Sequence, residues 1–409
     1  MTDFYDEREV RKRAARNEDN DRRLIAMAKE AYRHSPRVKK IFDEQGVVPS
    51  DIASADDLKK LPVLSREDVV RMEQEDPPYG GFARSDADVD RIFISPGPVY
   101  EPHLTEGTLW ARGYWAAGVR QADVVINTFS YHMVAAGLTF HEGLRRCGAT
   151  VVPSGTSSAE MQVQLLRDLG VTAYTGTPSY LMKILTTAEE KRVDVKTECS
   201  LKRAIFVAEP LTRPMRRVFE ETYGIDTYQM YGATEVGDIA YECPTKEGWH
   251  IVEDTIVEII DPETGKRVEP GTIGEIVVTK MNDIFFLFRF GTGDLGRVIE
   301  EPCPCGRTSV RIAGIEGRVG EAVKIRGLFV APSQLQGIAD EMPGCPFQLV
   351  VTRDNYRDRV AIRMVGSDGD AKKMKELFRS YCTLTADAIE RVDSIDGRKR
   401  IVDYRTWSQ

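Results

Sequence analysis

The sequence predicts an α/β fold with a large N-terminal domain of parallel, helix-covered sheets plus an antiparallel β unit, and a small α+β C-terminal domain. Two features of the sequence predict this fold. From about Asp88, short apolar runs alternate with helical stretches, which is the pattern of parallel sheets covered by helices. After Trp249, apolar runs follow one another across tight turns, which indicates antiparallel strands.

The composition fits a water-soluble protein of two or three domains. The chain has 409 residues, of which 42% are hydrophobic and 29% charged, which disfavours disorder, collagen and coiled coil. A formal net charge of −8 argues against nucleic acid as the main partner. No apolar run approaches a membrane span, and the first residues are charged throughout. Seven cysteines do not make a disulfide framework. We therefore expect a cytoplasmic protein with reduced thiols and no signal peptide.

The predicted elements follow in order along the chain. Residues 1–75 are charged and helical in pattern, with one helix over residues 21–32 and a shorter one that closes at Leu61-Pro62. Buried strands are predicted at residues 91–94, 123–127, 149–152, 173–175 and 204–207. Helices are predicted at residues 109–117, 135–147, 159–168, 179–191 and 213–222. In parallel sheets, the loops after the carboxyl ends of the strands carry the ligands.

The antiparallel unit has predicted strands at residues 255–260, 274–279 and 296–299. Turn-forming residues at 261–265 and 269–271 join them. From about Arg318 the pattern changes to a mixture of helices and strands. We therefore predict two domains, residues 1–317 and residues 318–409.

Three glycine-containing motifs are candidates for a binding site. The segment Tyr231–Glu235 follows a short strand and offers a hydroxyl and a carboxylate, which suit a nucleotide and its Mg²⁺. Asp294 lies between a Thr-Gly pair and the next strand, where a carboxylate can accept two hydrogen bonds from a ribose diol. The third motif, residues 317–327, combines glycines with basic residues. Each motif alone also fits an ordinary polar loop or turn.

Taken together, in this order and spacing, these motifs resemble the adenylate-forming superfamily of acyl-CoA synthetases, and within it the phenylacetate–CoA ligase family. The segments Val207–Thr212 and Thr177–Tyr180 and the helical region before Leu61-Pro62 add to the resemblance, which spans almost the whole chain. The resemblance implies ATP-dependent formation of an acyl-adenylate from an aromatic carboxylic acid, followed by thioester formation with coenzyme A. It also implies that residues 1–317 are the AMP-binding domain and residues 318–409 a mobile lid.

The resemblance further implies a role for individual residues. Glu235 matches the Mg²⁺ carboxylate, with Thr234 near the phosphates and Tyr231, next to Gly232, stacked on adenine. The adenine pocket would be lined by Ala208, Glu209 and Pro210. The ribose would be bound by Asp294 with the support of Arg318. The phosphate loop would contain Ser95 and Gly97.

In the predicted lid, the resemblance implies a hinge and a catalytic cation. Gly320 occupies the hinge position, where glycine permits a large backbone rotation. Lys399, in the segment 396–400, matches the catalytic lysine, whose charge would stabilise the reacting carboxylate and α-phosphate. One residue is missing from this segment relative to the family pattern, so Arg398 is an alternative to Lys399. The segment also fits a solvated basic tail with no catalytic role.

The phosphate loop departs from the family pattern. Ser95–Pro102 contains prolines that remove backbone donors, and Glu101 places negative charge where phosphates are expected to lie. Two alternatives to the ATP-dependent reaction therefore remain. The chain would transfer acyl groups without free ATP, or it would be a non-catalytic relative that binds a ligand.

Four residues form a candidate zinc site: Cys243, His250, Cys303 and Cys305. Three thiolates and an imidazole are the ligands of a closed tetrahedral zinc centre, and a branch of the family has a similar arrangement. The plain alternative is reduced cysteines beside a surface histidine.

The resemblance places the acyl pocket around four residues of the segment 129–137: Tyr131, His132, Ala136 and Gly137. Aromatic side chains there would stack on an aryl acid, although such a cluster also fits ordinary core. The predicted partners are thus an aromatic carboxylate and coenzyme A, and a homodimer is suggested by the resemblance alone.

Overall fold

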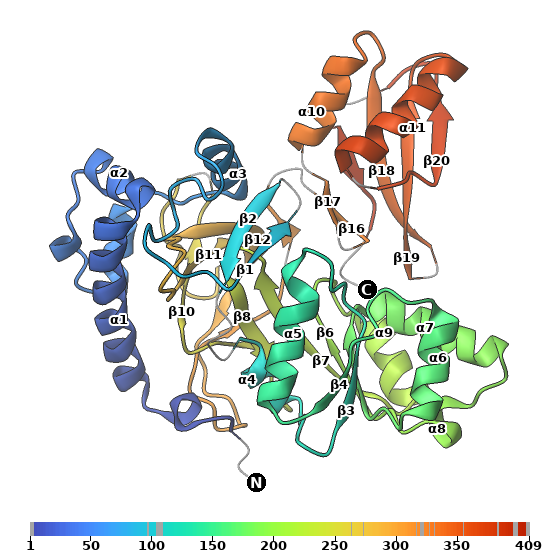
Figure 1. The fold of residues 1–409 in the computed structure, drawn as a ribbon, viewed down its shortest axis with the longest axis horizontal. Helices are drawn as coiled ribbons and strands as arrows, with labels where there is room; N and C mark the ends of the chain where they lie inside the picture. The colour runs from blue at the N-terminus through green and yellow to red at the C-terminus, as the bar shows by residue number, and fades with distance from the viewer. Residues whose placement is uncertain are drawn as a thin grey trace. The chain divides into compact units, whose positions relative to one another are not determined.

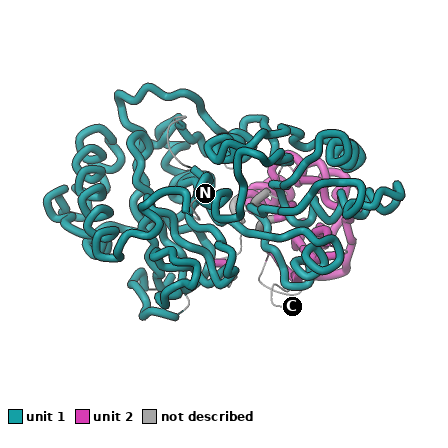
Figure 2. Tube along the Cα trace, turned by 90° about the horizontal axis from the view of Figure 1, so that it is seen from below, with its two compact units in different colours: residues 1–317 teal, residues 318–409 magenta. Residues whose placement is uncertain are grey.

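The computed structural model describes residues 4–95, 98–103, 109–262, 264–272, 274–315, 317–319, 323–326, 328–330, 332–354, 356–382, 384–395 and 400–405. The chain forms two compact units, residues 1–317 and residues 318–409, which Figure 2 shows in different colours. None of the helices in the described ranges combines the length and apolarity of a membrane span.

The first unit opens with helices that pack on the antiparallel strands (Figure 1). They are α1 (Arg13–His34), α2 (Pro36–Glu44) and α3 (Arg66–Glu75), with short 3₁₀ turns at Glu7–Val10, Pro49–Asp51 and Ala55–Lys60. Ser65 begins α3 as a capping box with Asp68, since each side chain satisfies a backbone N–H of the other. Phe42 of α2 meets Phe288 edge-on, with ring centroids 5.7 Å apart.

A nine-stranded mixed sheet forms the centre of this unit, with the strand order β13-β14-β9-β8-β7-β6-β5-β3-β4. Its parallel part comprises β3 (Val124–Asn127), β4 (Thr150–Val152), β5 (Ala173–Gly176), β6 (Arg203–Phe206) and β7 (Asp226–Ala233). Its antiparallel part comprises β8 (Gly237–Glu242), β9 (Trp249–Ile251), β13 (Val298–Ile299) and β14 (Arg311–Ile312). The flanking helices are α4 (Ala111–Ala116), α5 (Ala135–Arg146), α6 (Ala159–Asp168), α7 (Pro178–Glu190), α8 (Val195–Glu198) and α9 (Arg213–Arg217), which continues into a π-helical turn at Val218–Thr222.

Two smaller sheets complete the first unit. One is antiparallel, with β10 (Thr255–Ile260), β11 (Gly274–Lys280) and β12 (Phe290–Gly296) side by side. The two-residue β15 (Gly317–Arg318) is last in its strand order and spans the boundary between the units. The other is the hairpin of β1 (Arg91–Ser95) and β2 (Val99–His103).

The second unit has its own apolar core. It contains the hairpin β16 (Val323–Ile325) and β17 (Leu328–Val330), the helices α10 (Pro332–Glu341) and α11 (Asp368–Cys382), and a four-stranded sheet in the order β20-β19-β18-β21. The strands of that sheet are β18 (Phe347–Asp354), β19 (Arg357–Met364), β20 (Ala388–Arg391) and β21 (Ile401–Asp403).

The predicted fold class is confirmed, with three corrections. The predicted strand 296–299 is not a strand of the antiparallel unit, because β12 of that sheet ends at Gly296 and Val298–Ile299 pairs with β14 in the nine-stranded sheet. Antiparallel pairing begins at β8, before Trp249, because β7 turns back at once through residues 234–236 and pairs with the strand that follows. Most of the predicted loop Ser95–Pro102 is strand among the described residues, because residues 99–103 pair with β1 over its whole length.

A buried ion pair fastens the N-terminal helices to the antiparallel sheet. Arg289 is 3% exposed, and its Nε donates to the Glu258 carboxylate at 2.9 Å while its Nη1 donates to the Leu61 carbonyl at 2.7 Å. Replacing Arg289 by Met leaves the Glu258 charge buried without its main partner, so we expect the free energy of unfolding to fall by about 3–5 kcal/mol.

Arg267 provides a matched control, because this half-exposed side chain pairs with the same Glu258 carboxylate. Arg267→Met is expected to cost less than about 1 kcal/mol. Urea unfolding of the two variants measures the difference, and equal losses in both would show that burial of the pair does not matter.

Candidate functional site

The loop after β7 is held in one shape by close backbone packing. A side chain at Gly232 would bring its Cβ to 2.3 Å from the Gly237 carbonyl oxygen and 2.6 Å from the Trp110 ring, so only glycine fits. This contact lets β7 run directly into the turn that carries Thr234 and Glu235. The predicted motif Tyr231–Glu235 therefore lies at the carboxyl end of a parallel strand, where such sheets bind ligands.

Tyr231 and Asp294 meet across two sheets. The Tyr231 hydroxyl, on β7, donates to Asp294 Oδ2, on β12, at 2.9 Å. The Tyr231 ring also stacks on Trp249, with ring centroids 5.6 Å apart. Asp294 is half-buried, so part of the residue is accessible to solvent. The structure thus brings together two residues that are 63 positions apart and that the sequence assigned to one nucleotide.

Arg66 joins Glu235 to the β1–β2 hairpin. Its guanidinium, on the first turn of α3, pairs with Glu235 Oε1 and also donates to the Ser95 hydroxyl at 3.3 Å. Thr234 donates to the other Glu235 oxygen at 3.2 Å. Arg66 is not among the site residues predicted from the sequence. The capping box indicates a helix start at Ser65, but no local pattern shows that this helix lies beside β7.

Two further carboxylates lie near the Arg66–Glu235 ion pair. This clustering was not predicted from the sequence. The buried Glu101 accepts a hydrogen bond from the Ser95 hydroxyl at 2.9 Å, and the buried Glu73, on α3, accepts one from the Tyr100 N–H at 2.8 Å. Burial and then the Glu235 charge raise the pKa of Glu101 well above its ordinary value. Burial likewise raises the pKa of Glu73 to about 7.

The predicted adenine segment follows β6, the neighbour of β7 in the parallel sheet. Ala208 has a positive φ of 71°, which turns the chain sharply after the strand. The Glu209 carboxylate accepts a hydrogen bond from the Ser179 hydroxyl on the first turn of α7, and Pro210 is exposed. These three residues and the Tyr231–Glu235 motif therefore share one edge of the sheet.

The predicted acyl-pocket residues have unequal environments. The Tyr131 hydroxyl accepts from Asn127 Nδ2 at 2.9 Å and contacts His141 Nδ1 at 3.2 Å, and burial raises the pKa of Tyr131 to about 12. A Cβ at Gly137 would lie 2.3 Å from the Ser130 carbonyl oxygen, so glycine allows α5 to begin against this loop. Ala136 packs beside the adjacent core, whereas His132 is exposed.

Gly97, Gly320, Arg398 and Lys399 lie outside the described residues. Arg318 is described, but it belongs to the second unit, so its relation to Asp294 stays a prediction.

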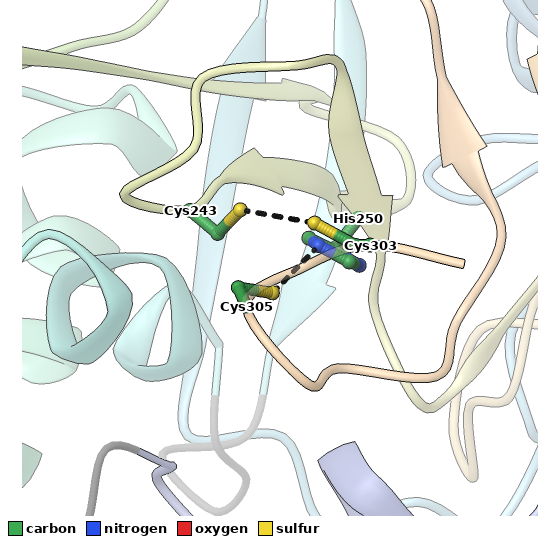
Figure 3. A group of neighbouring side chains, drawn as sticks. All are labelled: Cys243, His250, Cys303 and Cys305. Atoms are coloured by element: carbon green, nitrogen blue, oxygen red, sulfur yellow. Dashed lines mark hydrogen bonds between the residues drawn. The ribbon is translucent and has the colours of Figure 1, made fainter. Parts of the chain in front are cut away.

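The predicted metal ligands form one compact group (Figure 3). Cys243 follows β8, His250 lies on β9, and Cys303 and Cys305 belong to the turn between β13 and β14. One ligand atom from each lies within 4.8 Å of all the others. The Cys243 and Cys303 sulfurs are 3.7 Å apart, and Cys305 Sγ lies 3.4 Å from His250 Nε2.

The donor set fits a structural zinc ion. In a tetrahedral zinc site with Zn–S bonds of about 2.3 Å, neighbouring sulfurs lie about 3.8 Å apart. His250 Nδ1 lies 3.1 Å from the Ser309 hydroxyl, so an outer hydrogen bond orients Nε2 toward the three sulfurs.

Comparisons with known proteins agree with this architecture. The AMP-binding enzyme family matches residues 103–282. The chain is 32% identical to a phenylacetate-coenzyme A ligase of Aromatoleum evansii, over 94% of this chain and 93% of that protein. It is also 32% identical to the phenylacetate-coenzyme A ligase of Escherichia coli K12, over 89% and 83%.

Among solved structures, a 2-hydroxyisobutyryl-CoA ligase in complex with 2-HIB-AMP and CoA has the same fold. Its TM-score is 0.90 over 98% of this chain and 92% of that chain, at 22% sequence identity. Identity of 32% along nearly the full length of a curated relative shows that the chain belongs to the phenylacetate–coenzyme A ligase family of AMP-binding enzymes.

Proposed function

We propose that the chain activates an aromatic carboxylic acid with ATP, forming an acyl-adenylate and pyrophosphate, and then transfers the acyl group to coenzyme A. The observation that carries this proposal is the hydrogen bond between Tyr231 and Asp294. Thr234 and Glu235 belong to the same motif as Tyr231 and are hydrogen-bonded to each other. That arrangement supports one mononucleotide, with its ribose at Asp294 and its phosphates toward Thr234.

The first half-reaction needs a better leaving group on the acid. A carboxylate is a poor electrophile, and its attack on the α-phosphate of ATP forms a C–O–P link while the bond to pyrophosphate breaks. Negative charge on both reactants must be offset in the site. Arg66 supplies a guanidinium beside Glu235 and Ser95 for this purpose. Glu235 and Thr234 would hold a magnesium ion, which neutralises phosphate charge when bound.

The second half-reaction uses the activated acid. The sulfur of coenzyme A attacks the acyl carbonyl, a C–S bond forms, and the C–O bond to AMP breaks. The positioning of both reactants contributes most of the rate in such a transfer. Lys399 and the hinge at Gly320 remain predicted parts of this step.

A second candidate function is acyl transfer without free ATP. It is favoured by one observation, the buried Glu101 carboxylate close to the predicted phosphate site. Release of AMP and pyrophosphate with a panel of aromatic acids, ATP, Mg²⁺ and coenzyme A tests the first function. Thioester exchange without ATP, and no pyrophosphate with any acid, would favour the second.

Asp294→Ala is expected to raise the KM for ATP by roughly 10- to 100-fold, because a hydrogen bond to a charged group contributes about 1.5–3 kcal/mol. The exposed Asp283 offers a matched control, and Asp283→Ala is expected to leave the KM unchanged. Steady-state pyrophosphate release measures both variants. If Asp294→Ala kept the wild-type KM, Asp294 would not be the residue that binds the ribose.

Arg66→Gln is expected to lower kcat/KM for ATP by at least about tenfold, since the variant lacks the guanidinium near the phosphates. Arg71 lies on the same helix but is exposed and pairs with Asp68 and Glu75. Arg71→Gln should therefore behave as wild type in the same assay. If both variants kept full activity, Arg66 would have no part in phosphate binding.

We further propose that the Cys243, His250, Cys303 and Cys305 group binds one structural zinc ion. Purified protein should then contain about one zinc per chain, and Cys303→Ser should lose the metal and unfold at lower temperature. Cys199 lies outside the cluster, so Cys199→Ser should keep both properties. Metal analysis with thermal unfolding makes the comparison. Metal-free protein with unaltered stability would leave the cluster as ordinary reduced cysteines.

A further inference from the structure

The chain leaves the parallel sheet at the point where the predicted adenine segment begins. The pairing of β6 with β7 ends at Phe206 and Gln229, and residues 207–212 then lead from β6 to the start of α9. Beyond Gln229, β7 pairs with β8 on its other side. Contacts outside the strand ladder therefore fix the position of residues 207–212 relative to β7.

A side chain of β7 makes such a contact. Gln229 Oε1 accepts a hydrogen bond from the Leu211 N–H at 2.9 Å. Side chains two positions apart on a strand lie on the same face, so Gln229 projects from the face of β7 that carries Tyr231. The two groups of residues that the sequence assigned to adenine, Tyr231 and residues 208–210, are therefore linked through this hydrogen bond.

A buried ion pair fixes the orientation of the Gln229 amide. Its Nε2 donates to Glu242 Oε1 at 3.4 Å, and because a carboxylate only accepts, Oε1 is the atom that faces Leu211. Glu242 is 3% exposed, and its Oε2 accepts from the Gln229 backbone N–H at 2.9 Å. Arg216, on α9, donates to both Glu242 oxygens, at 2.7 and 2.9 Å. The amide thus rests on a charge-paired support.

The other contacts of residues 207–212 lie on the far side from β7. The Val207 N–H donates to the Gly176 carbonyl, on β5, at 3.3 Å. The Ser179 hydroxyl, on α7, donates to the Glu209 carboxylate at 2.5 Å. The segment is therefore held by β5 at its start and by α7 in its middle, and Gln229 joins it to β7.

We propose that Gln229 is a positioning residue for adenine recognition, which holds residues 207–212 at a fixed distance from Tyr231. The inference rests on the proposed nucleotide site. Glutamine meets both contacts at this position, because it accepts from Leu211 and donates to Glu242. A glutamate would place a second carboxylate against Glu242, and an apolar side chain would leave the Leu211 N–H without this acceptor. The contact serves selection of the base, since the ribose and phosphates are assigned to other residues.

Calorimetric titration of the full chain with AMP and with GMP tests the inference. GMP has the same ribose and phosphate as AMP and differs in its base. We expect the wild type to bind AMP more tightly than GMP. Gln229→Leu should reduce this preference by about fivefold or more, because the segment that contacts the base loses an orienting hydrogen bond. The reduction should come from weaker AMP binding, with little change for GMP.

A second variant and a control accompany this measurement. Gln229→Asn keeps an amide but is one methylene shorter, so it should lose the contact with Leu211 and show the same reduced preference. Gln164 is exposed on α6 and bonded to Asp168, so Gln164→Leu should bind both nucleotides as wild type does. Thermal unfolding of each variant identifies a folding defect.

The outcomes separate a positioning role from a merely structural one. A lower unfolding temperature with equal weakening of AMP and GMP in both Gln229 variants would overturn the inference. A wild-type preference for AMP in both variants, or a wild type that does not prefer AMP, would also overturn it. Loss of the preference in a chain that releases no pyrophosphate would support the inference and overturn only the proposed function.

Discussion

The hydrogen bond from Tyr231 to Asp294 joins two sheets, and the candidate nucleotide site depends on that junction. Tyr231 lies on β7, where the parallel and antiparallel parts of the nine-stranded sheet meet, and Asp294 lies on the antiparallel sheet. Gly232 allows β7 to pack closely against Gly237 and Trp110, and Thr234 and Glu235 follow in the turn at the end of this strand. Without the Tyr231–Asp294 hydrogen bond, the residues predicted to bind the phosphates and the ribose would not be held at a fixed distance from each other.

Charge balance is the second constraint on the site. Arg66 reaches Glu235 and Ser95 from a helix near the N-terminus, so helix α3 contributes a side chain to the proposed nucleotide site. The Arg289–Glu258 pair fastens the segment that ends at Leu61 to the antiparallel sheet, only a few residues before Arg66. The stability of this attachment therefore bears directly on the position of the one guanidinium that we assign to phosphate binding.

Local sequence patterns were sufficient for the fold class and for the composition of the zinc cluster. The alternation of strands and helices specified the parallel sheet, and the four metal-type residues meet in one group. Arg66, Glu73 and the hairpin of β1 and β2 could not be predicted in this way. Their contacts join segments far apart in the sequence, and prolines in Ser95–Pro102 suggested a loop although residues 99–103 pair fully with β1.

A crystal structure of the protein with AMP bound tests the central claim most directly. The account predicts ribose hydroxyls within hydrogen-bond distance, about 3 Å, of Asp294, and the phosphate beside Thr234 in the same cavity. AMP bound elsewhere, or with its ribose away from Asp294 and its phosphate away from Thr234, would contradict the account.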